Sequence, residues 1–172
     1  MDLVNDQGET VKSYFLAAAF LWIAPGAVVA FEAGDYIDLG SCSPSSQSFA
    51  QCAKDVRASC VDVAADNAQY YRSCEHEFFR QADQLLNDYY KIAVIKAKAV
   101  ERGFDGTAYS GQEELLRQSQ RAWLPVRDTT CDLAVSFGAL MSGAAAKVSH
   151  CKARLTLQRI ADLEKEIGFY LK

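Results

Sequence analysis

The residues of this sequence best suited to chemistry lie in one helix-like stretch, LRQSQRAWLPVRDTTC, from Leu116 to Cys131. On a helix, Gln120, Trp123 and Arg127 share one stripe with Cys131, because they are spaced at about whole turns. A guanidinium on such a stripe can form two parallel hydrogen bonds with a carboxylate. If the stripe is buried, that carboxylate must come from the same chain, since an unpaired buried charge is very costly.

The complementary carboxylate lies upstream, on a long helical pattern where Asp83 and Asn87 share a stripe. The glycine-rich segment RGFDGTAYSG, residues 102–111, is typical of a loop that joins two antiparallel helices. We expect Asp83 to accept hydrogen bonds from Arg127 across that pair, with Asn87 and Gln120 filling the remaining bonds. Buried networks of this kind usually specify packing, so we interpret these four residues as a structural polar network.

Arg117 and Arg121 lie one turn apart and off that stripe, which predicts that both face solvent. Arg121 has Asp128 seven residues further on and could join a surface ion-pair row. Such rows contribute little to stability, so both arginines are interpreted as solvated surface residues.

Groups that could catalyse a reaction are few. The two histidines, His76 and His150, stand in no motif that would pair them with a nucleophile. Neighbouring carboxylates on a helix point in different directions and usually form solvated faces; the pairs here are Glu113–Glu114 and Glu164–Glu166. Segment 102–111 lacks the preceding strand and the GK[ST] motif of a phosphate loop. The sequence therefore predicts neither an enzyme nor a bound cofactor.

Four helical patterns position these residues, and no segment shows the alternation of apolar and polar residues that is typical of a strand. In chain order the helices cover residues 44 to about 60, 66 to about 102, a third beginning near 112, and about 148 to 170. The small-residue run FGALMSGAAAK, residues 137–147, predicts the last turn. The expected fold class is all-α, a compact disulfide-stapled helical bundle of about four helices.

Three features predict where these helices begin or bend. Ser43 followed by Pro44 is typical of a cap and a first helical position. Asp66 or Asn67 could cap the next helix. Pro125 removes a backbone donor and is expected to kink or locally break the third helix.

The N-terminal segment is typical of a signal peptide. An apolar run from Tyr14 to Ala24 follows Lys12, ends at a Pro-Gly break, and precedes small residues at the −3 and −1 positions of a cleavage site after Ala30. The run is too short for a comfortable membrane span, which needs about 20 residues. We therefore predict a cleaved segment 1–30 and a single helical domain 31–172 that begins with an extended lead-in. An uncleaved N-terminal anchor is the alternative.

All cysteines follow that segment, and their even number in an exported chain indicates disulfides in an oxidising compartment, periplasmic or extracellular. They are Cys42, Cys52, Cys60, Cys74, Cys131 and Cys151. No pair has the CxxC spacing, so a zinc site is not expected. The formal net charge of −4, without any concentration of basic residues, argues against nucleic-acid binding.

The segment from Leu116 to Cys131 resembles the motif LRxxQRAWLxxRDxxC of the LprI-like lysozyme inhibitor family. Two further motifs match at the expected spacing, CxxxxFxxADxxLNxxY from Cys74 to Tyr90 and CxxxLTxxRxxxL from Cys151 to Leu163. Three motifs in the same order, with cysteines in register, make the resemblance extend over residues 60–163. Its signature residues include Arg117, Arg121, Trp123, Asp128, Thr156 and Arg159.

The resemblance implies a disulfide pairing, namely Cys60–Cys74 and Cys131–Cys151, which leaves Cys42–Cys52. A rival stays open, because a straight antiparallel hairpin of the first two helices would place Cys52 beside Cys74. That rival would leave the two other cysteines of the region about 25 Å apart along a helix, so sequential pairing is preferred.

The resemblance also implies an exported protein that binds a lysozyme-type muramidase and blocks its cleft. Segment 102–111, with Arg102, Phe104 and Tyr109, is the hypothetical plug, because it is polar, contains glycines and carries aromatic side chains of the kind enriched in binding hot spots. A plain connector of this length would be ordinary and is the alternative.

A second hypothesis is an immunity protein against a secreted cell-wall toxin, or an envelope scaffold module, that shares the fold without inhibiting lysozyme. An apolar patch outside the core would favour it; the candidates are Ile92, Val94, Ile95, Val100 and Gly168–Leu171. The sequence predicts neither the oligomeric state nor the type of lysozyme.

Overall fold

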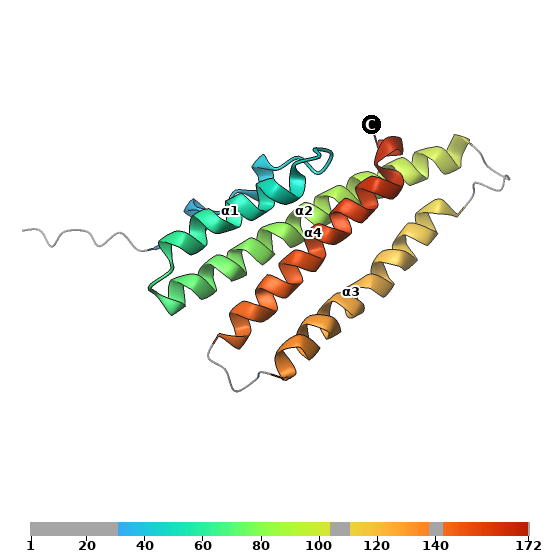
Figure 1. Ribbon diagram of the computed structural model, residues 1–172. Helices are drawn as coiled ribbons and strands as arrows, with labels where there is room; N and C mark the ends of the chain where they lie inside the picture. Colours follow the sequence, from blue (N-terminus) through green and yellow to red (C-terminus); the bar gives the residue numbers. More distant parts are fainter. Residues whose placement is uncertain (1–30, 104–110, 138–142, 172) are drawn as a thin grey trace, which may run out of the picture. The chain divides into compact units, whose positions relative to one another are not determined.

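The computed structural model describes residues 31–103, 111–137 and 143–171, and the expected signal peptide lies outside them. The described residues form four α-helices and two short 3-10 helices, which are η1 (Ala33–Asp35), η2 (Leu39–Ser41), α1 (Phe49–Val63), α2 (Ala68–Gly103), α3 (Gln112–Ser136) and α4 (Ala144–Leu171) (Figure 1). These residues contain no strand. The predicted all-α fold of about four helices is therefore confirmed.

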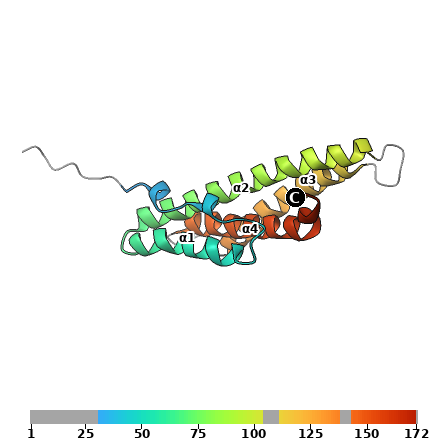
Figure 2. The same ribbon diagram turned by 90° about the horizontal axis from the view of Figure 1, so that it is seen from above.

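Helices α2 and α4 run parallel to each other, and α3 is antiparallel to both (Figure 1). Two contacts give the parallel register, His150 with Glu75 and Tyr89 with Glu164, and each joins residues 75 positions apart. Helix α1 lies along the N-terminal half of α2 (Figures 1 and 2). This arrangement follows from the chain, because the reversals after α2 and after α3 each invert its direction once.

The apolar core lies where the N-terminal segment, α1, α2 and α4 meet. Its largest fully buried apolar side chains are Ile37, Leu39, Leu86 and Ile160. On α2 the buried positions Phe78, Ala82 and Leu86 recur every four residues, so one face of this long helix is apolar. This face fixes the position of α2 against α4.

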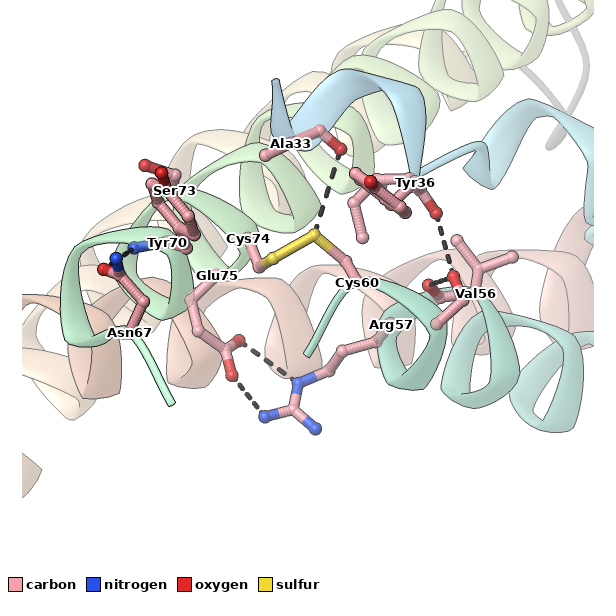
Figure 3. The surroundings of a disulfide bond; sticks show 12 residues. Ala33, Tyr36, Val56, Arg57, Cys60, Asn67, Tyr70, Ser73, Cys74 and Glu75 are labelled. Carbon is pink, nitrogen blue, oxygen red and sulfur yellow. Dashed lines mark hydrogen bonds and ion pairs between the residues drawn. A yellow bond between two sulfur atoms is a disulfide. The ribbon is translucent and has the colours of Figure 1, made fainter. Parts of the chain in front are cut away.

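Three disulfides staple the unit, and they are Cys42–Cys52, Cys60–Cys74 and Cys131–Cys151. Their Cα–Cα distances are 5.8, 5.8 and 5.6 Å, within the usual range. The structure therefore has the pairing that the family resemblance implied, and the rival Cys52–Cys74 bond is not formed. The second disulfide joins α1 to α2 next to η1 (Figure 3).

The N-terminal segment packs against α2 through 3-10 turns, which differs from the extended lead-in that we expected. Gln81 of α2 donates from Nε2 to the Ile37 carbonyl (2.7 Å), and its Oε1 accepts the Leu39 N–H (2.9 Å). One side chain thus satisfies two backbone groups of a segment whose apolar side chains are buried.

Helix α1 begins at Phe49, later than the Ser43–Pro44 start that the sequence suggests. The Ser43 carbonyl instead accepts the Ser46 N–H in a turn (3.0 Å). The reason is the first disulfide, which ties the residue before this turn to the first turn of α1 and makes the intervening chain loop. The predicted Ser-Pro cap is therefore wrong.

The caps of the next two helices use side chains. Asn67, one of the two expected caps, accepts the N–H groups of Gln69 (2.9 Å) and Tyr70 (3.1 Å) at Oδ1, so it caps α2. The start of α3 is capped from α2, because Glu101 Oε1 accepts the Glu113 N–H (2.7 Å). This contact joins the two helices at the end where the chain reverses.

Helix α3 runs as one helix from Gln112 to Ser136 and is not broken at Pro125. Pro125 has no N–H to donate within the helix, but its carbonyl accepts a hydrogen bond from Thr129 Oγ1 (2.7 Å). The helix is therefore not locally broken at Pro125, and the kink stays a prediction.

Helix α4 begins at Ala144, earlier than the start near residue 148 that we expected. Gly143 before it has a φ of +96°, in the left-handed region that favours glycine. Residues 138–142 of the predicted turn lie outside the described part of the chain.

Candidate functional site

A polar layer joins α2, α3 and α4 around Arg127, whose side chain is 8% exposed. Its Nη1 donates to Asp83 Oδ1 on α2 (2.7 Å) and to Thr156 Oγ1 on α4 (3.4 Å). Its Nε donates to Asp128 Oδ1 on α3 (3.0 Å). The guanidinium thus meets two carboxylates and a fully buried hydroxyl, which is how a charge can be kept out of water.

Aromatic rings complete this polar layer. The Arg127 Cζ lies 5.3 Å from the ring centroid of Phe79 and 5.2 Å from that of Trp123. The Arg159 Cζ lies 5.8 Å from the Trp123 ring, so the indole contacts two guanidinium groups. Burial lowers the pKa of Arg159. Each desolvated cation–π contact contributes on the order of 1–2 kcal/mol.

Two members of the expected network contact other partners. Asn87 Nδ2 donates to Asp83 Oδ2 (3.2 Å), and Gln120 Oε1 accepts from Arg159 Nε (3.3 Å). Asn87 therefore contacts the Asp83–Arg127 pair through Asp83, whereas Gln120 contacts Arg159 and not this pair. The two amides thus orient groups on either side of Arg127.

The two surface arginines of α3 pair with acids at the start of the same helix. Arg117 Nε donates to Glu113 Oε1 (2.7 Å), and Arg121 Nη2 donates to Glu114 Oε1 (2.7 Å). Asp128, the partner suggested for Arg121, lies in the polar layer instead. Since Glu114 and Asp128 are equally far along the chain from Arg121, spacing alone could not choose between them.

A second charged cluster, which the sequence did not reveal, surrounds Glu75, a side chain with 0% exposure. Its carboxylate accepts hydrogen bonds from Arg57 of α1 (Figure 3) and lies 3.2 Å from His150 Nδ1 of α4. Burial alone would raise the pKa of Glu75, but the bonds from His150 and Arg57 hold it below its ordinary value. His150 is therefore more than a local surface residue, whereas His76 is exposed.

One feature of the sequence indicates this cluster. Glu75, Phe78, Ala82 and Leu86 recur at helical spacing, and all four are buried. A carboxylate on an apolar stripe signals a buried charge that needs a cation from another element. The partner could not be identified in advance, because Arg57 and His150 come from two different helices.

Other carboxylates expected on solvated faces take part in packing. Glu164 Oε2 accepts a hydrogen bond from the Tyr89 hydroxyl at 2.5 Å, and burial together with this carboxylate raises the pKa of Tyr89. Within residues 31–103, 111–137 and 143–171, no group of three or more His, Cys, Asp or Glu could hold a metal ion. Over the same ranges, no helix combines the length and apolar character of a membrane span.

The candidate partner-binding residues divide between two parts of the chain. Arg102 is exposed in the last turn of α2. Phe104 and Tyr109 lie outside the described residues. The structure therefore positions the base of the hypothetical plug and not its aromatic side chains.

The fold and the polar layer define a class of protein, a disulfide-stapled helical unit whose three long helices meet on a buried arginine–tryptophan layer. The chain belongs to the family of lysozyme inhibitor LprI, whose model matches residues 60–163, so the resemblance is confirmed. An uncharacterized protein of Rhizobium meliloti (strain 1021) is 36% identical over 94 residues, which is 54% of this chain and 68% of that protein. No solved structure matches the chain.

Proposed function

We propose that the protein is an exported inhibitor that binds a lysozyme-type muramidase and blocks its cleft. The observation that carries the proposal is the family match over residues 60–163, which includes every member of the polar layer. The three disulfides support a place outside the cytoplasm, periplasmic or secreted.

The chemistry of the target supports a polar plug. A glycoside-hydrolysing cleft has two carboxyl groups, so an inserted cation or hydrogen-bond donor would complement it. We propose segment 102–111 as the plug, with Arg102 at its base and Phe104 and Tyr109 as aromatic anchors. Arg102 is suited to this role because it is exposed at the end of α2. The polar layer would then act by holding α2 and α3 in place.

The test is lysis of a peptidoglycan suspension by c-, g- and i-type lysozymes with increasing amounts of oxidised protein. We expect saturable inhibition of one type, lost when the disulfides are reduced. The double variant Arg102→Ala/Tyr109→Ala should weaken inhibition at least about tenfold. The control Arg121→Ala, on the exposed face of α3, should not. Folded protein that inhibits none of the three types would refute the proposal.

A second candidate is an immunity or envelope scaffold module of the same fold. The observation that favours it is apolar surface, since Ile92, Ile95, Phe169 and Tyr170 are 50%, 64%, 84% and 68% exposed. Val94 is buried and does not belong to such a surface. Capture of an envelope protein by wild type but not by Phe169→Ser, without any lysozyme inhibition, would support this candidate.

We propose further that residues 1–30 are a signal peptide that is removed on export. Mass spectrometry of protein recovered from the periplasm should then give an N-terminus at Phe31. An intact chain in the membrane fraction would establish the anchor alternative.

A further inference from the structure

A hollow of about 420 Å³ opens between α1 and α4, with Phe78 of α2 at its base. Both helices lie against α2 (Figures 1 and 2), and the hollow occupies the groove between them. Its apolar base consists of Phe78 and of Phe49 and Ala53 from α1, all three buried. Leu157 and Ala161 of α4 continue the apolar surface. The volume lies within the roughly 300–1,000 Å³ of sites that hold small organic molecules.

The charged side chains that line this hollow are all basic. Lys54 and Arg57 come from α1, and His150 and Arg154 come from α4. None of the described residues that line it is an Asp or a Glu. The chain as a whole has an excess of acids, with a formal net charge of −4. The hollow therefore differs in sign from the rest of the chain and favours an anionic ligand.

Two of these cations, Lys54 and Arg154, have no acidic partner. Neither side chain forms an ion pair or a hydrogen bond within the part of the chain that the structure describes. The positions three and four residues before and after each of them hold no acid, so neighbours on their own helix cannot neutralise them. Other cations at the surface do pair in this way, as Arg80 does with Glu77. The two charges beside the apolar base are thus available to a ligand.

The other two basic residues are held in place by Glu75, which is fully buried and does not line the hollow. Arg57 donates from Nε and Nη2 to the two oxygens of Glu75, and its third nitrogen points away from that carboxylate (Figure 3). Because Glu75 neutralises one cation, an excess of two positive charges remains when His150 is neutral. A guanidinium that is already fixed loses less conformational freedom when it binds an anion.

We propose that this hollow binds a small amphiphilic anion, in which one apolar chain ends in a carboxylate or phosphate head. The chain would pack on the apolar base, and the head would lie between Arg57 and Arg154. A guanidinium binds either head through parallel hydrogen bonds. The volume suits a single chain of about ten carbons with its head, at the roughly 30 Å³ that a water-sized group occupies.

The first test is isothermal titration calorimetry of the full oxidised chain with sodium decanoate, at concentrations below those that form micelles. We expect saturable binding of one decanoate per chain. Decanol has the same chain without the charge, and acetate has the charge without the chain. Both should bind at least about tenfold more weakly, because each lacks one half of the interaction. Decyl phosphate shows which of the two heads the site prefers.

The second test changes the cations and the space separately. Arg154→Ala should raise the dissociation constant of decanoate at least about tenfold. Its control is Lys165→Ala, an exposed cation of the same helix outside the hollow, which should stay within about threefold of wild type.

The variant that changes the space is Ala161→Phe, which fills the hollow and keeps every cation. It should also weaken binding at least about tenfold, whereas Ala134→Phe on an exposed position of α3 should not. Far-UV circular dichroism checks that each variant is folded. All variants carry the same N-terminal segment, so a difference between them reports on the changed residue.

The absence of saturable binding of either anion would overturn the inference, as would equal affinities for decanoate and decanol. Decanoate binding that Arg154→Ala or Ala161→Phe leaves unchanged would overturn it as well. If wild type binds no amphiphile and Arg154→Ala abolishes lysozyme inhibition, the cations belong to the muramidase interface and the inference fails. The calorimetry contains no lysozyme, so failure of this site and failure of the proposed function are distinguishable.

Discussion

Arg127 is the residue on which the three long helices meet. It bonds Asp83 of α2 and Thr156 of α4, and its own helix contributes Asp128 and Trp123. Because one side chain satisfies groups from each helix, its loss affects all of their interfaces at once. Arg121, only six residues away, contacts a single exposed acid.

Arg127→Ala should lower the free energy of unfolding by about 2–4 kcal/mol, because it removes charge-assisted hydrogen bonds and two cation–π contacts and leaves a cavity. Arg121→Ala should change it by no more than about 0.5 kcal/mol, as an exposed substitution. Urea unfolding of both variants measures the difference. Equal losses of unfolding free energy in the two variants would show that the polar layer does not stabilise the fold.

Glu75 gives stability a dependence on pH. Its folded pKa lies below its ordinary value of 4.5, so its contribution is complete above about pH 4.5 and is lost as the pH falls through the folded pKa. Glu75→Gln should therefore destabilise the protein by about 1.5–3 kcal/mol at pH 7, and less in acid.

The measurement is urea unfolding of wild type and Glu75→Gln between pH 3 and 7. The control is Glu166→Gln on the exposed side of α4, which should track wild type at every pH. A difference between wild type and Glu75→Gln that stays constant over this range would contradict the assignment.

How far the site could be predicted depends on where each partner lies. The Asp83–Arg127 pair could be predicted, because both residues lie on helices that a short connection makes antiparallel neighbours. The partners of Gln120 and Glu75 could not, because Arg159 and His150 belong to α4, whose position against α2 and α3 is a property of tertiary packing. Single-sequence spacing carries no information on that position.

At the scale of elements, the sequence predicted the start of a helix correctly where a local interaction alone determines it. Asn67 caps α2 as the sequence suggested, because the cap depends only on neighbouring backbone groups. The predicted start of α1 was wrong because a disulfide overrides the Ser-Pro signal. The predicted break at Pro125 was wrong because the loss of one hydrogen-bond donor does not interrupt the helix.

Pro125→Ala should raise the free energy of unfolding by about 1–3 kcal/mol. Alanine restores a helical donor at an exposed position, and the gain is partly offset because proline restricts the unfolded chain. Pro44→Ala, in the turn before α1, is the control and should not stabilise. Thermal and urea unfolding compare the two, and a destabilised Pro125→Ala variant would mean that the packing of α3 requires the proline.

At the scale of the whole molecule, disulfides supply stability that the core alone does not. Replacing Cys131 and Cys151 together by serine should lower the free energy of unfolding by about 3 kcal/mol, since their disulfide closes a loop of 20 residues. Replacing Cys42 and Cys52 should cost somewhat less, since their separation is 10 residues. Urea midpoints of the two double variants test this order, and an inverted order would show that native packing outweighs loop closure.

The placement of the disulfides divides the chain into two halves. Two of them lie before the end of α2 and the third joins α3 to α4, so none crosses the interface between α2 and the last two helices. A backbone cut between Gly103 and Gly111 would leave two separately cross-linked fragments bound only by noncovalent contacts. They would elute together in native buffer and separate in urea without a reducing agent, so the protein is suited to fragment complementation, in which co-elution after removal of the urea reports reassembly.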